Sequence, residues 1–438
     1  MTDSDMSTDA AGAGTAAPTR TVADSRGRQD GPSQLPRPLG GWARKAAFFG
    51  PAFIVSMAYV DPGNFATNTA AGASYGYLLL WVIVVANVVA MFVQYLSAKL
   101  GMATGRSLPE LCRETCGRPL TLFLWGQAEI VAIATDLAEL IGGAVALNLL
   151  FGIPLIPGAL ITAAVSILLL TLAPQGRHRF EMVLAGMLLI ILGGFLYQAV
   201  AAGPSHEAAA GLVPGFAGTE SLLLATGIVG ATVMPHVIYL HSALARSTDH
   251  DPARQGRALR RTRREIVIAL SFAGLANMTM LVVAAAVFHR DGHTGTDTLY
   301  EAYQGLGSLL GPTAAMAFAV ALLAAGLASS SVGTYAGQII MEGFLRRRIP
   351  LVLRRAATLL PATVILLAGM EPTRALILSQ AALSFCIPFA LVPLIIFTSS
   401  RKFMGPLVNR RRTTVTAGAA VVLISGLNVF LLAEPLFD

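Results

Sequence analysis

The stretch VDPGN, residues 60–64, places a carboxylate and an amide beside a proline and a glycine within a long apolar segment. Pro62 lacks a backbone N–H and clashes with the preceding turn, whereas Gly63 unwinds at little cost. We therefore expect the helix to break around residues 58–64 and to free backbone carbonyls such as that of Ala58. Free carbonyls in lipid are costly, so such a break persists where it lines a cavity or binds something.

Asp61 and Asn64 would bring two oxygen ligands to this break. A carboxylate and an amide oxygen are hard donors that suit a cation, and an acid inside a membrane span is by default a functional candidate. The alternative is a structural ion pair. However, no basic residue lies in the apolar part of this segment or of the second one that contains a break. We therefore expect Asp61 and Asn64 to bind a metal ion.

A second break is predicted in GATVMPHVIYLH, residues 230–241. Pro235 would free carbonyls one turn back, near Ala231. Met234 alone would usually be core filler, but beside a broken helix that faces a carboxylate its thioether is a plausible soft ligand. Oxygen ligands alone suit Mg²⁺ or Ca²⁺, and an added thioether shifts the preference towards Mn²⁺, Fe²⁺ and similar transition metals.

Three further polar side chains are candidates, two histidines of the second break and one amide in the tenth span. His236 and His241 project about 140° apart on a helix, so they are not expected to hold one ion together. For His236 a proton or gating role and a packed, hydrogen-bonded role are both open, and for His241 the structural role is favoured. Gln380 is a lone amide in an apolar run, which would either complete a coordination shell or bridge helices.

Three acids share one predicted span. Glu129, Asp136 and Glu139 are spaced by seven and three residues, which places all three carboxylates on one helical face. Buried acids at this spacing indicate a proton relay or the wall of a vestibule. Our hypothesis is that they form a polar route to the cytoplasm with Arg354 and Arg355. The alternative for the two arginines is snorkelling at a helix end.

The composition identifies the kind of protein that carries these residues. Of 438 residues 55% are hydrophobic and 13% charged, and the mean hydropathy is +0.66, which favours a polytopic membrane protein. The net charge is +7, but the basic residues form short clusters between apolar segments, which does not favour a nucleic-acid partner. Cys112, Cys116 and Cys386 give no disulfide framework; a metal or redox role for the first two is the less favoured alternative.

Eleven apolar segments of membrane-spanning length position the candidate residues. The expected spans are 47–70, 76–99, 119–147, 153–173, 181–202, 219–245, 265–288, 311–342, 350–369, 375–398 and 413–433. The two breaks fall in the first and sixth spans, five helices apart, as expected for inverted five-helix repeats of a transporter. The expected organisation is a disordered cytoplasmic tail, two repeats and a last helix, at 1–44, 45–202, 219–398 and 413–433.

The charges of the connections predict the orientation. The even-numbered loops are rich in arginine, above all residues 246–264, whereas the odd-numbered ones are neutral or mixed. Basic loops stay in the cytoplasm. The expected arrangement in the cell membrane has the N-terminus inside and, after eleven spans, the C-terminus outside.

The motifs resemble those of a known family. DPGN and MPH at the breaks, ATDLAE at 134–139 and GLASSSVGTYAGQIIMEGFL at 326–345 are similar to the Nramp family of proton-coupled divalent-metal transporters, including its bacterial MntH-type members. The resemblance covers roughly residues 45–433. It implies an all-α, LeuT-like 5+5 inverted repeat with an extra helix. It also implies import of Mn²⁺, and of Fe²⁺ and similar ions such as Cd²⁺ and Co²⁺, driven by protons.

The resemblance also implies roles for single residues. Metal-binding side chains would be Asp61, Asn64 and Met234, with the carbonyls of Ala58 and Ala231. The proton-pathway positions would be His236, Asp136, Glu139, Arg354 and Arg355. Besides metal ions, protons and lipid, no cofactor, nucleic acid or obligate protein partner is expected. The rival readings are a Na⁺-coupled organic-solute carrier, a channel and a membrane enzyme, the last lacking a nucleophile–base set.

Overall fold

The computed structural model describes residues 50–170, 177–203, 206–247, 251–289 and 298–433, and within these ranges the chain is helical without a β-strand. The predicted tail at 1–44 lies outside the described residues. The stretch from Ala47 onwards forms one compact unit. The first half of this unit contains α1 (Pro51–Ala58), α2 (Pro62–Tyr75), α3 (Leu80–Thr104), α4 (Leu108–Thr115), α5 (Arg118–Phe151), α6 (Leu155–Leu170), α8 (Arg177–Ala202) and the 3₁₀ turn η1 (His206–Leu212).

The second half repeats this pattern of long and broken helices. It contains α9 (Gly218–Thr232), α10 (Pro235–Leu244), α11 (Pro252–Ala284), the π-helical turn η2 (Ala285–His289), α12 (Leu299–Leu309), α13 (Pro312–Leu345), α14 (Leu351–Leu367) and α15 (Pro372–Ser399). The chain then continues through α16 (Arg401–Met404), the 3₁₀ turn η3 (Gly405–Leu407) and α17 (Arg411–Ala433).

Each of the eleven predicted segments is mostly helical within the described residues. Eight stretches of the described chain are long and apolar enough to cross a membrane. The other three predicted spans are the pair α1 and α2, the 16-residue α6 and the 17-residue α14. Large apolar side chains such as Val88 and Val200 remain exposed on these helices, at 59% and 84%. This exposure fits helices that lipid solvates from outside.

Both predicted breaks are present, and each lies at a proline. The first helix stops at Ala58, and α2 begins at Pro62 after an extended Asp61. The sixth segment stops at Thr232 and restarts at Pro235. A proline at the first helical position loses no hydrogen bond, because the N–H there would have no partner within the helix.

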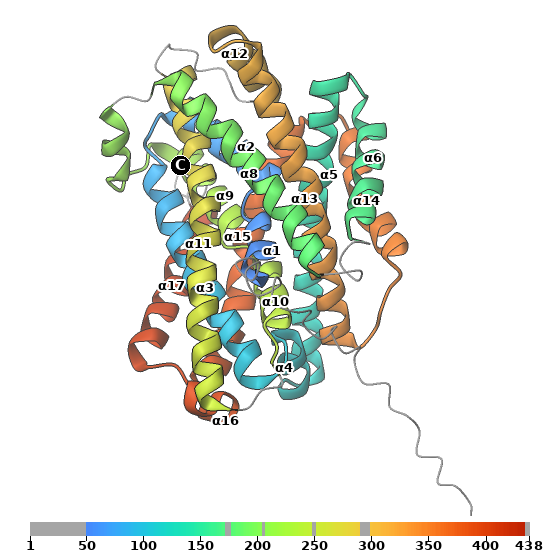
Figure 1. Cartoon of the computed structure of the whole chain (residues 1–438), viewed down its shortest axis with the longest axis vertical. Helices are drawn as coiled ribbons and strands as arrows, with labels where there is room; N and C mark the ends of the chain where they lie inside the picture. Colours follow the sequence, from blue (N-terminus) through green and yellow to red (C-terminus); the bar gives the residue numbers. More distant parts are fainter. Residues whose placement is uncertain (1–49, 171–176, 204–205, 248–250, 290–297, 434–438) are drawn as a thin grey trace, which may run out of the picture. The chain divides into compact units, whose positions relative to one another are not determined.

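The two halves pack against each other reciprocally. The short helices α1 and α10 lie in the interior in Figure 1. Helix α1 contacts α10, and α2 contacts α9, so each half-helix meets the opposite half of the other broken segment. In the same way α3 packs on α9 and α10, while α11 packs on α1 and α2. This exchange is the packing expected of inverted repeats and brings both breaks to the centre.

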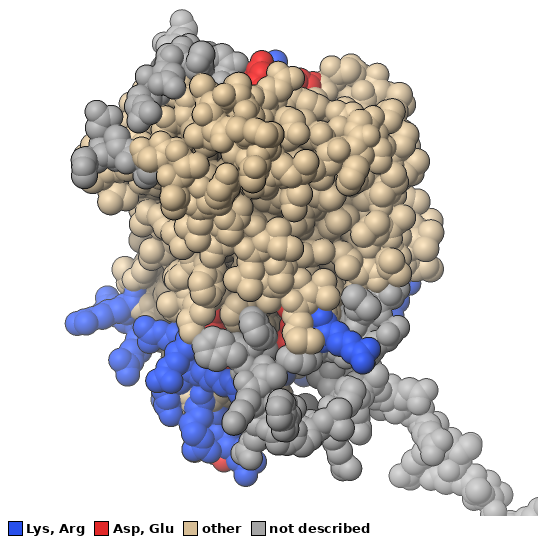
Figure 2. Space-filling view, turned by 45° about the horizontal axis from the view of Figure 1, so that its top comes forward, with Lys and Arg blue, Asp and Glu red and all other residues tan. Residues whose placement is uncertain are grey.

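Charged residues gather at one end of the helices. In Figure 2 lysine and arginine side chains lie along the lower rim, and the broad middle of the visible face is almost free of charge. This end contains α4 and α16, and α12 lies at the opposite end in Figure 1. The uncharged band is the surface that a bilayer would cover.

Candidate functional site

At the first break, two of the predicted ligands cap the helix that follows. Asp61 Oδ1 accepts a hydrogen bond from the Asn64 N–H at 2.8 Å, and Asn64 Oδ1 accepts the Asp61 N–H at 3.4 Å. This reciprocal capping box fixes both side chains at the start of α2. The helical partner of the Ala58 carbonyl would be Pro62, which has no N–H to donate. That carbonyl is therefore free of its usual bond, as the sequence predicts.

The second break also leaves a backbone carbonyl without a helical donor, but it has no polar side-chain cap. Ala231 precedes Pro235 by four residues, so its carbonyl also lacks the usual helical donor. Met234 occupies the capping position of α10, and its side chain makes no cap hydrogen bond. The hydroxyl of Thr232 is buried and has no hydrogen-bond partner among the described residues. Met234 thus adjoins in sequence a free carbonyl and a buried hydroxyl that lacks a hydrogen-bond partner among the described residues.

Gln380 of α15 touches both breaks. Its Nε2 donates to Asp61 Oδ2 at 3.4 Å. A Cβ atom on Gly63 would collide with the Gln380 side chain, and one on Gly230 would collide with the Gln380 carbonyl. Both glycines therefore allow α15 to approach closely. The predicted bridge between helices is present, and the amide also lies beside the proposed ligand carboxylate.

The six residues predicted for the metal site are buried, with exposures of 0–1%: Ala58, Asp61, Asn64, Ala231, Met234 and Gln380. In the described part of the chain no three His, Cys, Asp or Glu side chains form a cluster that could hold a metal. The predicted donor set does not depend on such a cluster, because it combines one carboxylate with amide, thioether and carbonyl donors. This mixture suits a transition-metal dication better than a high-charge calcium cage.

The two histidines face different helices. His236 Nδ1 lies 3.3 Å from Thr135 Oγ1 on α5, and its buried Nε2 has no hydrogen-bond partner among the described residues. His241 Nδ1 lies 2.9 Å from Gln94 Oε1 on α3. His236 therefore adjoins the helix that bears the acids, whereas His241 is tied to a neighbouring amide.

The acids of α5 meet the predicted arginines of α14. Asp136 Oδ1 lies 3.0 Å from Arg355 Nη1, and Glu129 Oε2 lies 3.2 Å from Arg354 Nη2. Glu139 interacts electrostatically with Asp136, Arg355 and Asp61. The carboxylate of Glu139 is therefore within electrostatic range of both the first break and the inner ion pair.

The burial of the three acids corrects one expectation. The sequence predicts that all three carboxylates are buried in the span, and Asp136 and Glu139 are 1% exposed. The Glu129 side chain, in contrast, is 16% exposed. Glu129 lies two turns closer to the helix end than Asp136, about 10 Å along the axis, so it approaches the rim of the bundle. The row of acids runs from the interior towards the surface.

Sequence reasoning missed the groups that hold Arg355 and the first break in place. Arg355 Nη2 donates to Ser166 Oγ at 2.6 Å and also to the Ser330 hydroxyl. Asn277 Nδ2 donates to the Tyr59 carbonyl at 2.8 Å, which satisfies one of the carbonyls in the break. Asn277 is a lone amide in an apolar run, as Gln380 is, and this signal could have identified it.

The cysteines lie outside this arrangement and form no disulfide. Cys112 is buried on the short helix α4, and burial raises the pKa of its thiol well above the ordinary range. A protonated thiol is a poor metal ligand, which favours the structural reading of Cys112.

This fold defines the class as a polytopic membrane protein with two discontinuous helices. Each half of one broken helix packs against the opposite half of the other, around a buried acid. The fold resembles that of Mhp1, a nucleobase-cation-symport-1 family transporter in a closed, bromovinylhydantoin-bound form. That structure has a TM-score of 0.59 at 14% identity and covers 89% of this chain and 90% of its own. The fold is thus LeuT-like, as the family resemblance of the sequence motifs implies.

The chain belongs to the Nramp (Natural resistance-associated macrophage protein-like) family. The model of this family matches residues 52–434. A mutant of the Eremococcus coleocola manganese transporter aligns with a TM-score of 0.80 at 33% identity, over 92% of this chain and 90% of its own. A Deinococcus radiodurans protein named divalent metal cation transporter MntH is 52% identical over 398 residues, 90% of this chain and 91% of that protein.

Proposed function

We propose that this protein imports divalent transition-metal ions, namely Mn²⁺ together with Fe²⁺ and similar ions such as Cd²⁺ and Co²⁺. The transport is coupled to protons and is not driven by nucleotide hydrolysis. The names of its relatives, a manganese transporter and a divalent metal cation transporter, support the substrate class. The observation that carries the proposal is the packing of the two broken helices against each other, with Gln380 of α15 contacting Asp61 at the first break and Gly230 beside the second. This arrangement combines one carboxylate with neutral oxygen and sulfur donors.

In the proposed cycle a partly hydrated ion binds to deprotonated Asp61. Asn64, Met234 and, in particular states, the carbonyls of Ala58 and Ala231 replace some of its water. All these groups are 0–1% exposed in the present conformation, so an ion can reach them only when helices move. This burial supports alternating access, in which the broken helices open first to one side and then to the other.

Protons would follow the acids of α5. Metal arrival displaces a proton from Asp61, or through it, to Glu139 and the Asp136–Arg355 pair. The Glu129–Arg354 pair then leads towards the rim, because Glu129 is the most exposed acid of the row. His236 adjoins this route through Thr135. His241 would have a structural role, because it links α10 to Gln94 of α3.

We further propose that the arginine-rich end faces the cytoplasm of a cell that carries the protein in its inner or plasma membrane. The uneven distribution of Lys and Arg in Figure 2 supports this orientation. The N-terminal tail would then lie inside and the C-terminus outside. The two repeats would span 45–202 and 219–398, with the last helix at 413–433.

The test is uptake by the purified full chain in proteoliposomes with an imposed pH gradient. We expect Mn²⁺ to enter faster when the outside is acidic and Cd²⁺ to compete, whereas Mg²⁺ competes poorly. Entry of an amino acid instead of Mn²⁺ would replace the proposal with the organic-solute carrier. Mn²⁺ uptake that is independent of the pH gradient, without acidification of the lumen, would keep metal transport and refute proton coupling.

A further inference from the structure

A cavity of about 670 Å³ lies between α3, α11 and the segment that joins α15 to α17. It extends along α3 from Val88 to Lys99, a separation of eleven helical rises or roughly 16 Å. Its two ends differ in chemistry. Val88 and Phe92 form an apolar end that is open towards lipid, whereas Lys99, Arg263 and Arg410 line the other end.

Lys99 is a buried cation without a carboxylate partner among the described residues. It is 6% exposed, and its Nζ donates to Asn409 Oδ1 at 2.7 Å. Asn409 is in turn fixed by two bonds to Thr398, from its N–H to the carbonyl at 2.9 Å and from Nδ2 to Oγ1 at 2.8 Å. An ammonium group has three donors, so Lys99 is held in place with donor capacity to spare.

Two arginines complete the positive end. Arg263 of α11 and Arg410, just before α17, both act electrostatically on Tyr95, which lines the same cavity. Neither arginine forms an ion pair with any described residue, in contrast to the neighbouring Arg261, which pairs with Glu265 at 3.0 Å. None of the described residues lining the cavity is acidic.

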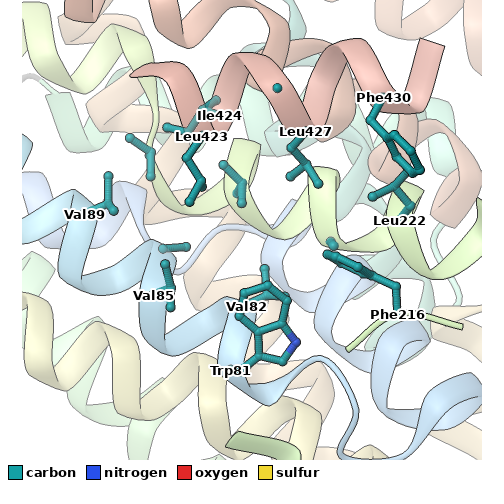
Figure 3. A pocket seen from close by; sticks show the side chains of 15 residues that line it. Trp81, Val82, Val85, Val89, Phe216, Leu222, Leu423, Ile424, Leu427 and Phe430 are labelled. Atoms are coloured by element: carbon teal, nitrogen blue, oxygen red, sulfur yellow. The ribbon is translucent and has the colours of Figure 1, made fainter. Parts of the chain in front are cut away.

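A second cavity provides an internal contrast. It measures about 350 Å³ and lies between α3, α9 and α17, where Trp81, Phe216 and Phe430 face it in Figure 3. Its lining includes no charged side chain among the described residues. An apolar cavity of this kind could accept an acyl chain from any lipid, so it has no means of selecting a headgroup.

We infer that the larger cavity binds an anionic phospholipid, with the phosphate of its headgroup between Lys99, Arg263 and Arg410 and an acyl chain along Val88 and Phe92. Uncompensated cations beside a lipid-facing apolar wall fit a molecule that is both anionic and amphipathic. A soluble phosphate would leave the apolar end unused. The cavity lies at the arginine-rich end of the spans, and anionic lipids concentrate in the leaflet that faces such residues.

The experiment compares the full chain with variants in nanodiscs of phosphatidylcholine, with and without phosphatidylglycerol. Native mass spectrometry measures bound phosphatidylglycerol, and thermal unfolding measures the accompanying rise in Tm. A double variant, Arg263→Gln with Arg410→Gln, changes two exposed side chains and leaves the core intact. We expect its affinity for phosphatidylglycerol to fall about fivefold for each arginine removed, or roughly 25-fold.

Arg264→Gln is the matched control, because Arg264 is an exposed neighbour on the same helix that does not line the cavity. We expect this control to bind phosphatidylglycerol as the unchanged protein does. An equal loss in control and double variant would reveal a diffuse surface attraction and overturn the proposal. The proposal would also be overturned if inorganic phosphate, added to protein in pure phosphatidylcholine, gave the full rise in Tm. Since lipid binding is the readout, failure here would leave the proposed metal transport untouched.

Discussion

The two helix breaks share the same backbone arrangement at a proline and differ in the side chains beside it. Each has a proline at the start of the second half-helix and a carbonyl that this proline leaves without a donor. The first break carries a carboxylate and an amide that cap α2 reciprocally. The second carries a thioether at the capping position and no polar cap.

The difference indicates a division of labour. The proposed ligands of the first break hold each other in a capping box, and one of them is a carboxylate. Asp61 also acts electrostatically on Glu139, which interacts in turn with Asp136 and Arg355. The second break carries no acid and no side-chain cap, so we expect it to rearrange at lower cost, and in the proposed site it contributes the soft ligand. Charge and proton linkage should therefore depend on the first break, and ion selectivity on the second.

The largest expected effect is on the charge of the first break. Asp61→Asn keeps a good N-cap residue but removes the only carboxylate among the proposed ligands. We expect Mn²⁺ uptake to fall to the level of protein-free liposomes while the Tm changes little. Asp61→Ala should lose uptake equally and also lose about 1 kcal/mol of stability with the cap. Substantial Mn²⁺ flux through Asp61→Asn would show that the charge of this break is not needed.

Next in size is the ion pair behind the first break. Arg355→Met leaves Asp136 buried without a counterion, which should cost about 3–5 kcal/mol of unfolding free energy. The matched variant Arg354→Met should cost less, because its partner Glu129 is 16% exposed and can be hydrated. Denaturation in detergent measures both. Adding Asp136→Leu to Arg355→Met should restore most of the loss, and equal costs for the two arginines would contradict the ordering by burial.

A smaller effect is expected on selectivity at the second break. Met234→Leu keeps the volume of the side chain and removes the sulfur, so Mg²⁺ and Ca²⁺ should compete with Mn²⁺ roughly tenfold better, which is about 1.4 kcal/mol. Competition in proteoliposomes measures this ratio. Unchanged selectivity would refute the assignment of the soft ligand to this break.

The smallest effect concerns the missing cap. Met234→Ser and Met234→Ala both lack the thioether, but serine can accept a hydrogen bond from the first turn of α10. We expect Met234→Ser to be about 1 kcal/mol more stable than Met234→Ala. Thermal unfolding compares the two. Equal stability would mean that the second break is already satisfied by groups other than its own side chains, and the contrast between the breaks would lose its basis.

Much of the fold was predictable because it depends on local composition and covalent chemistry. The eleven apolar segments follow from the length of helix that crosses a bilayer. The breaks at Pro62 and Pro235 follow from a missing N–H, which no tertiary contact can restore. The acids of α5 share a face because helical spacing alone determines it. The unequal burial of Glu129 was not predictable, since burial depends on where neighbouring helices end.

The amino-acid sequence by itself thus determined the spans, the positions of the two breaks and the types of ligand beside them. Only the tertiary structure decided that Gln380 reaches Asp61 across 319 positions of sequence, and that Arg355 selects Asp136 while Arg354 selects Glu129. It also decided that Lys99, Arg263 and Arg410 share one cavity. The physical reason is the separation along the chain of the groups that interact. A backbone break is settled by its own residues, whereas a contact between distant helices depends on the packing of every helix between them.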